Sequence, residues 1–149
     1  MSTKRKKAYV LLSAMLYLAS LTQDAFFINR VDYDAWASSA WLVAVGWAGA
    51  LLGGGAALVW FANPLLFLSW GLSFFSLKLA RWASVYTALL AASFLLFDEI
   101  ITSEAPTYST ITHYRAGYWL WLASCVVYAA CLWFPVEDSV AGQSSTALD

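Results

Sequence analysis

The chain has 149 residues, of which 62% are hydrophobic and only 11% charged, and its net charge at pH 7 is −1. A soluble domain of this length needs far more charge to cover its surface, and the balanced charge offers no basic face for a nucleic acid. Long uncharged runs between short charged islands are instead typical of a protein embedded in lipid, so the bilayer is its first predicted partner.

The first predicted helix, over residues 8–28, follows a strongly basic start. Four positive side chains open the chain: Lys4, Arg5, Lys6 and Lys7. Positive residues stay on the cytoplasmic side of a membrane segment, so the N-terminus is predicted to be cytoplasmic. A signal peptide begins in the same way, but Leu21 stands where its cleavage site needs a small residue, and we therefore expect an uncleaved helix.

The second predicted helix, over residues 40–62, carries a row of glycines at Gly46, Gly49 and Gly53. Glycines at such spacing let two helix backbones approach each other closely. The interpretation that we favour for so small a bundle is packing against another helix of the same chain. The alternative is a dimerisation face between two copies.

The next stretch, "WFANPLLF", sets Asn63 and Pro64 into an otherwise apolar run. Asn favours the cap position of a helix and Pro its first turn, so one helix is predicted to end just before the pair and a half-helix to cover residues 64–78. Two alternatives stay open. One is a continuous helix that is kinked at Pro64, and the other is a turn at residues 53–55 followed by one kinked helix over residues 56–77.

Three serines recur on one face of the predicted half-helix: Ser69, Ser73 and Ser76. Together with Asn63 they form a thin polar stripe, which a channel or carrier uses as a pathway. The more common role of such serines is to bond back to their own helix or to pack against a neighbour. No charged residue falls near a predicted bilayer midplane, and this argues against ion-coupled transport.

The remaining helices are predicted over residues 82–101 and 116–134, before a disordered polar tail at 135–149. Residues 1–134 then form a single all-α domain, an integral membrane helical bundle with four net crossings and a broken helix at the Asn-Pro pair. Four crossings bring six of the eight basic residues to the cytoplasmic side. The positive-inside rule therefore favours four crossings over the alternative of five.

Titratable side chains gather in the loop between the last two helices: Asp98, Glu99, Glu104, His113 and Arg115. Carboxylates with a histidine can bind a metal or act as acid and base, but this spacing matches no metal motif. A solvated loop without a metal or a catalytic group is therefore expected. We also predict that Arg115 pairs with Asp98 or Glu99 at the membrane surface and joins the two ends of the loop.

Two short stretches, "WFANPLLFLSW" and "AGYWLWLAS", resemble a group of small bacterial multi-pass membrane proteins. That group has a Trp-x-Ala-Asn-Pro-Leu-Leu stretch in mid-chain and a Gly-Tyr-x-Leu-Trp stretch at the start of its final helix. The resemblance implies a bacterial inner membrane and a helical bundle, but no particular activity. The matching positions are expected to be structural rather than catalytic: Asn63, Pro64, Gly117, Tyr118 and Trp121.

The sequence favours a non-enzymatic membrane protein that acts through helix–helix contacts, as an accessory subunit or an immunity-type protein. Its expected partner is another membrane protein or a second copy of the chain. It carries none of the short motifs of nucleotide binding, metal binding or nucleophilic catalysis, so no cofactor is expected. The first alternative is a channel or carrier for small solutes, and the second is a membrane enzyme that uses the loop at 98–115.

Overall fold

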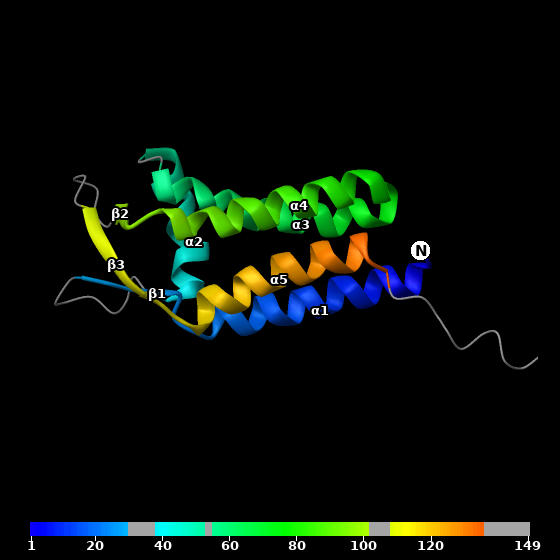
Figure 1. Ribbon diagram of the computed structural model, residues 1–149, viewed down its shortest axis with the longest axis horizontal. Coiled ribbons are helices and arrows are strands. Elements are labelled where there is room, and N and C mark those ends of the chain that lie inside the picture. The colour runs from blue at the N-terminus through cyan, green and yellow to red at the C-terminus, as the bar shows by residue number, and fades with distance from the viewer. Residues whose placement is uncertain (30–37, 53–54, 102–107, 136–149) are drawn as a thin grey trace, which may run out of the picture.

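The computed structural model describes residues 1–29, 38–52, 55–101 and 108–135, and most of this chain is helical (Figure 1). The helices are α1 (Thr3–Leu21), α2 (Ser39–Leu52), the 3₁₀ helix η2 (Gly55–Phe61), α3 (Ala62–Phe75), α4 (Leu77–Ser93), the 3₁₀ turn η3 (Phe94–Leu96) and α5 (Ala116–Trp133). The strands are β1 (Phe26–Ile28), β2 (Glu99–Ile101) and β3 (Tyr108–Tyr114). Gly53, Glu104 and the tail from residue 136 lie outside the described residues.

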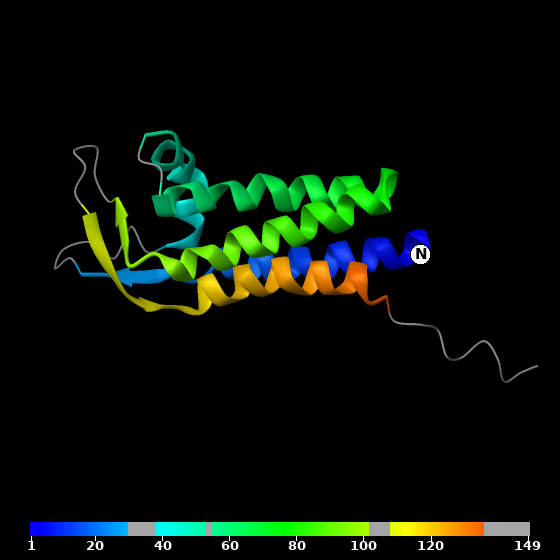
Figure 2. The same cartoon turned by 45° about the horizontal axis from the view of Figure 1, so that its top comes forward.

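Four long helical segments lie lengthwise beside one another: α1, η2 with α3, α4 and α5 (Figures 1 and 2). α1 packs along α5, α3 along α4, and α4 along α5. By length and composition, three segments are able to cross a membrane: Gly55–Phe75, Leu77–Leu96 and Ala116–Trp133. They have 18 to 21 residues, close to the ~20 that a hydrocarbon core of ~30 Å requires.

Small side chains line the contacts between these helices. Several alanines and serines have no exposed surface: Ala62, Ala80, Ala91, Ser13, Ser69, Ser73, Ser84 and Ser124. Because small residues let helix backbones approach closely, they favour tight packing where lipid gives no hydrophobic driving force between helices. Larger buried side chains, among them Leu66, Tyr128 and Leu132, fill the space that remains in the core.

A small antiparallel sheet, in the order β1-β3-β2, lies at the end of the bundle away from the N-terminus (Figure 1). The prediction of an all-α fold is therefore only partly right. The predicted helices 8–28 and 82–101 end early, at Leu21 and Leu96, and strands follow them. β3 is rich in threonine, isoleucine and tyrosine, residues that fit a half-buried pleated surface.

The middle of the chain is divided differently from the leading prediction. α2 ends at Leu52, and a 3₁₀ helix and an α-helix then run without a gap from Gly55 to Phe75. Gly55 has φ +57°, a conformation that glycine adopts at little cost. The predicted break at Asn63-Pro64 is thus wrong. The described helices divide between Leu52 and Gly55 instead, where one alternative put a turn, and the Asn-Pro pair lies at the change from 3₁₀ to α geometry.

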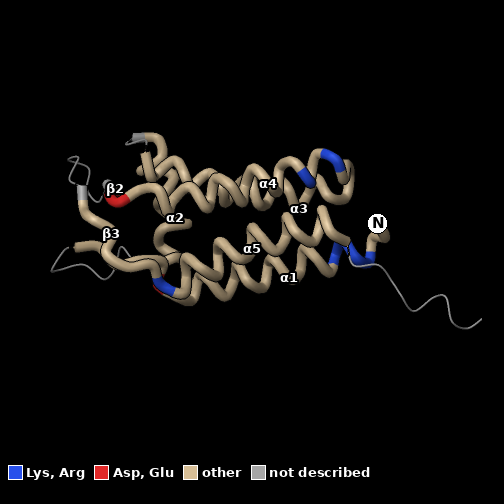
Figure 3. The backbone as a smooth tube through the Cα atoms, viewed as in Figure 1, with Lys and Arg blue, Asp and Glu red and all other residues tan. Residues whose placement is uncertain are grey.

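Charged residues are segregated along the long axis of the bundle (Figure 3). The basic start of α1 and the basic pair at the start of α4, Lys78 and Arg81, lie at the same end, although they are far apart in the sequence. Arg81 donates its Nε–H to the carbonyl of Leu132 at 2.9 Å and lies over the ring of Trp133. α2 and the sheet lie at the opposite end (Figure 1).

Candidate functional site

Asn63 is the centre of a polar junction inside the bundle. Its side chain is only 5% exposed. The Oδ1 atom accepts hydrogen bonds from the hydroxyl of Tyr17 at 3.2 Å and from the indole N–H of Trp121 at 3.0 Å. One amide group therefore joins α1, α3 and α5, which belong to the first, second and fourth of the long helical segments.

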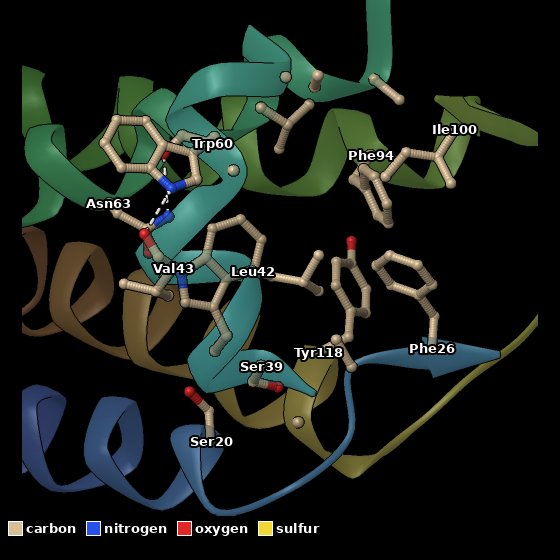
Figure 4. Close-up of a pocket in the computed structure, with 18 of the residues that line it drawn as sticks. Ser20, Phe26, Ser39, Leu42, Val43, Trp60, Asn63, Phe94, Ile100 and Tyr118 are labelled. Carbon is tan, nitrogen blue, oxygen red and sulfur yellow. Dashed lines mark hydrogen bonds between the residues drawn. The ribbon is translucent and has the colours of Figure 1, made fainter. Parts of the chain in front are cut away.

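The Nδ2 atom at the other end of the Asn63 amide compensates for the proline that follows it. In a regular α-helix the carbonyl of Trp60 would accept from the backbone N–H of residue 64, but proline has none. The Nδ2 atom of Asn63 donates to that carbonyl at 2.9 Å (Figure 4). The Asn side chain thus supplies the donor that Pro64 removes, which lets the helix pass the proline with its carbonyl satisfied.

A second polar contact lies deeper in the bundle. The hydroxyl of Ser13 donates to the carbonyl of Ser124 at 2.8 Å and accepts from the indole N–H of Trp70 at 3.2 Å. The hydroxyl of Tyr128 donates to the carbonyl of Ser69 at 3.2 Å. These bonds again connect α1, α3 and α5, so the long helices are held together by hydrogen bonds as well as by packing.

The predicted serine stripe is bonded within its own helices. The hydroxyls of Ser69 and Ser73 donate to the carbonyls of Leu66 and Trp70, each at 2.7 Å. Ser76 caps α4 instead and accepts from the backbone N–H of Leu79 at 3.4 Å. Together with the bonds of Asn63, this leaves these side chains as structural elements rather than as a row of free polar groups.

The two described glycines of the predicted row, Gly46 and Gly49, face η2 of the same chain. A Cβ added at Gly46 would overlap the indole of Trp60, and one added at Gly49 would touch the side chain of Ala57 at an ordinary 3.5 Å. The indole N–H of Trp60 also donates to the carbonyl of Val43 at 3.0 Å (Figure 4). These contacts agree with the favoured interpretation of packing inside the chain.

Gly117 allows the start of α5 to lie against the turn after α1. Its N–H donates to the carbonyl of Asp24 at 2.8 Å. A Cβ at this position would overlap both that carbonyl and the hydroxyl of Ser39. A glycine is therefore required because three segments meet at this point: the end of α1, the start of α2 and the start of α5.

Arg115 does not make the predicted ion pair with Asp98 or Glu99, although the structure describes all three residues. Its guanidinium lies over the ring of Phe27, 4.4 Å from the centroid, at a distance typical of a cation–π contact. Its backbone N–H donates to the carbonyl of Ala25. Arg115 therefore joins the start of α5 to β1, whereas the prediction paired it with Asp98 or Glu99.

The titratable groups near the sheet do not form a metal site within the described ranges, where no three His, Cys, Asp or Glu residues come together. His113 is exposed on β3 and pairs with Phe27 across the sheet. Tyr114 bonds to the carbonyls of Phe94 and Phe97. Burial, and to a smaller extent the negative charge of Asp98, raises the pKa of Tyr114 above its usual value.

A cavity of about 170 Å³ lies beside the Asn63 junction, where α2 and η2 meet the starts of β1 and α5 (Figure 4). Its wall is mostly apolar and includes Phe26, Leu42, Val59, Phe94, Tyr118 and Trp121. The rings of Phe26, Phe94 and Tyr118 pack on one another, with centroids 5.4 and 5.6 Å apart for the successive pairs. No charged side chain lines the cavity among the described residues.

Ser39 is the exception among the buried polar groups of the described chain. It lines the cavity, is 7% exposed, and its Oγ atom has no hydrogen-bond partner there. A buried hydroxyl without a partner costs about 1–3 kcal/mol.

The cavity was not anticipated from the sequence. Its lining comes from eight separate elements and from the turn after α1, so no local pattern of residues encodes it. The closest signal was the pair of stretches around Asn63 and Gly117, both of which border it. Comparisons with known protein families, with characterised proteins and with solved structures find no match for the chain.

Proposed function

We propose that this chain is a four-crossing protein of the bacterial inner membrane, with its N-terminus in the cytoplasm, that acts without catalysis through helix–helix contacts. Its role is that of an accessory subunit, or of an immunity-type protein that blocks a membrane-acting partner. The observation that carries the proposal is a row of large apolar side chains on the outer face of α4.

That row consists of Leu79, Trp82, Tyr86 and Leu89, which are 56 to 66% exposed. Its spacing of three, four and three residues is that of a seam between two packed helices. α1 carries a shorter row of the same kind, Leu11, Met15 and Leu18, each 61% exposed. Helices of a partner can interlock with such rows inside the bilayer.

The proposed orientation rests on charge. The basic start of α1 and the pair Lys78 and Arg81 lie at one end of the bundle (Figure 3), and the positive-inside rule assigns such an end to the cytoplasm. Four crossings by α1, η2 with α3, α4 and α5 are consistent with this assignment. The outer side of the membrane then holds α2 and the three strands β1, β2 and β3.

Cysteine labelling tests this orientation. In a chain with Cys125→Ala and Cys131→Ala, we expect Thr112→Cys to react with an impermeant thiol reagent on intact cells. Phe75→Cys, at the 90% exposed end of α3, should react only in inverted vesicles. Labelling of Thr112→Cys from the inside would exclude the four-crossing topology.

Photo-crosslinking tests the contact role. A photoreactive residue at Leu89, 66% exposed on α4, should give one adduct of defined mass in cells. The same residue at Val126, 46% exposed on α5, serves as the matched control and should give much less of it. Equal yields from both positions, or none from either, would argue against a partner at the α4 row.

The alternative of a channel or carrier needs polar groups that a solute can reach along a path. The hydroxyls of Ser69 and Ser73 donate to carbonyls of their own helix, and Asn63 is bonded to three neighbours. These bonds favour the contact role over transport.

A further inference from the structure

We propose that the cavity beside Asn63 is a binding site for one uncharged amphiphile, a single ring or a chain of about six to eight carbons that carries one oxygen. This inference does not depend on the proposed helix partner. It rests on the size of the cavity, on its apolar wall and on the unpartnered hydroxyl of Ser39.

The volume of the cavity limits the size of the ligand. The cavity measures about 170 Å³. A dry apolar cavity of about 150 Å³ takes up benzene, so a single ring, or a short chain of similar volume, fits the present one. A complete phospholipid does not fit, although the first carbons of one ester-linked chain do.

The composition of the cavity wall determines the charge of the ligand. Aliphatic and aromatic side chains from α2, η2, β1 and α5 form it, and the rings of Phe26, Phe94 and Tyr118 gather on one side (Figure 4). Among the described residues no Lys, Arg, His, Asp or Glu lines the cavity to neutralise an ion. Because burial of an unpaired charge is very costly, the ligand is uncharged.

Ser39 supplies the polar anchor. Its hydroxyl lies against Gly117, where it finds no acceptor among the described residues. Ser39 lines the cavity, and because its hydroxyl makes no hydrogen bond in the described chain, a change to another staggered rotamer loses none. An oxygen on the ligand satisfies the one hydroxyl of the cavity wall that the described part of the chain leaves unpaired.

The position of the cavity gives such a ligand access. It lies where α2 meets the long helices, at the end opposite the N-terminus (Figures 1 and 4). In the proposed orientation this is near the outer surface of the bilayer, where amphiphiles concentrate with the oxygen at the interface and the carbon chain in the lipid. The chemistry fits both the ester-linked end of a lipid chain and a free small molecule.

Photolabelling of the full-length protein in lipid nanodiscs tests the site. The probe is a diazirine derivative of 1-octanol, with 1-hexanol, hexane and hexanoate as competitors. We expect saturable adducts on lining residues of α2 and η2, displaced by hexanol and not by hexanoate. Adducts that are as frequent on the outer face of α4 as in the cavity, or that hexanol does not displace, would overturn the proposal.

Variants test the anchor and the volume. Ser39→Ala should weaken competition by hexanol about 2- to 10-fold, as expected for one lost hydrogen bond, and should leave competition by hexane unchanged. Ala57→Leu should fill the cavity and abolish labelling there. If Ala57→Leu does not fold, Gly49→Ala, which the geometry tolerates, should reduce labelling. Gly71→Ala, in open space on α3, is the matched control. Equal loss of hexanol and hexane competition in Ser39→Ala would refute the anchor.

Mass spectrometry of the protein purified in mild detergent separates the two sources of ligand. A lipid bound one to one and displaced by hexanol identifies a lipid chain as the occupant. A protein that is isolated empty and still takes up hexanol identifies a free small molecule. A protein that carries no lipid and binds no hexanol contradicts the proposal.

Discussion

The pairing of Asn63 with Pro64 leads to a quantitative prediction. Asn63→Leu removes the partner of three groups at once: the Tyr17 hydroxyl, the Trp121 indole N–H and the Trp60 carbonyl. At about 1 kcal/mol for each net hydrogen bond, or somewhat less inside a bilayer, the free energy of unfolding should fall by about 2–3 kcal/mol. Pro64→Ala returns a backbone N–H that can donate to Trp60. In that background, the penalty of Asn63→Leu should therefore shrink by about 1 kcal/mol.

The assay is reversible unfolding in mixed micelles with increasing dodecyl sulfate, followed by far-ultraviolet circular dichroism. All four chains of the double-mutant cycle are needed, because Pro64→Ala also changes the entropy of the unfolded chain. Tyr17→Phe combined with Pro64→Ala is the control. Tyr17 bonds to the other end of the amide, so these two changes should add. A coupling between Asn63→Leu and Pro64→Ala within about 0.5 kcal/mol of zero would refute the reasoning.

Three further predictions concern single positions. Gly117→Ala should lower the free energy of unfolding by about 1–3 kcal/mol because of overpacking, whereas Gly71→Ala, in open space, should be neutral or slightly stabilising in the same assay. Ser69→Ala should leave solute flux in liposomes unchanged, since its hydroxyl bonds to its own helix; altered flux would favour a carrier. The pKa of Tyr114 is raised in the folded chain, so its contribution to stability holds below pH ~10 and is lost as the pH rises further. Tyr114→Phe should therefore show a shallower alkaline loss of stability in a pH series of unfolding curves.

The apolar runs predicted the helical segments of the bundle, because long uncharged stretches have few alternatives in lipid. The helix predicted over residues 116–134 matches α5 almost exactly in length. The Asn-Pro pair was harder to interpret, since the same two residues suit a helix cap and a repaired proline site equally well. The hydrogen bond from the Asn63 side chain to the Trp60 carbonyl distinguishes the two roles, and only the structure shows it.

The sheet and the cavity were beyond the reach of local patterns. β1 has three residues, and its partner β3 lies far along the chain, so neither forms a recognisable hairpin with the other. Arg115 illustrates the same limit. Opposite charge nearby in the sequence suggested a carboxylate partner, but the antiparallel register of β1 and β3 brings the ring of Phe27 under it instead.

The Asn63 junction also bears on the order in which the chain can assemble. Tyr17 leaves the ribosome before Asn63, so one of the two donors to its Oδ1 atom is available early. Trp121, the other donor, comes from α5, which is made after all the other described helices. Until α5 is in place, the amide oxygen has only one of its two donors and the Ser13 hydroxyl lacks its acceptor at Ser124. A nascent chain stopped before α5 therefore holds α1 and α3 together by only part of the hydrogen bonds that join them in the finished protein.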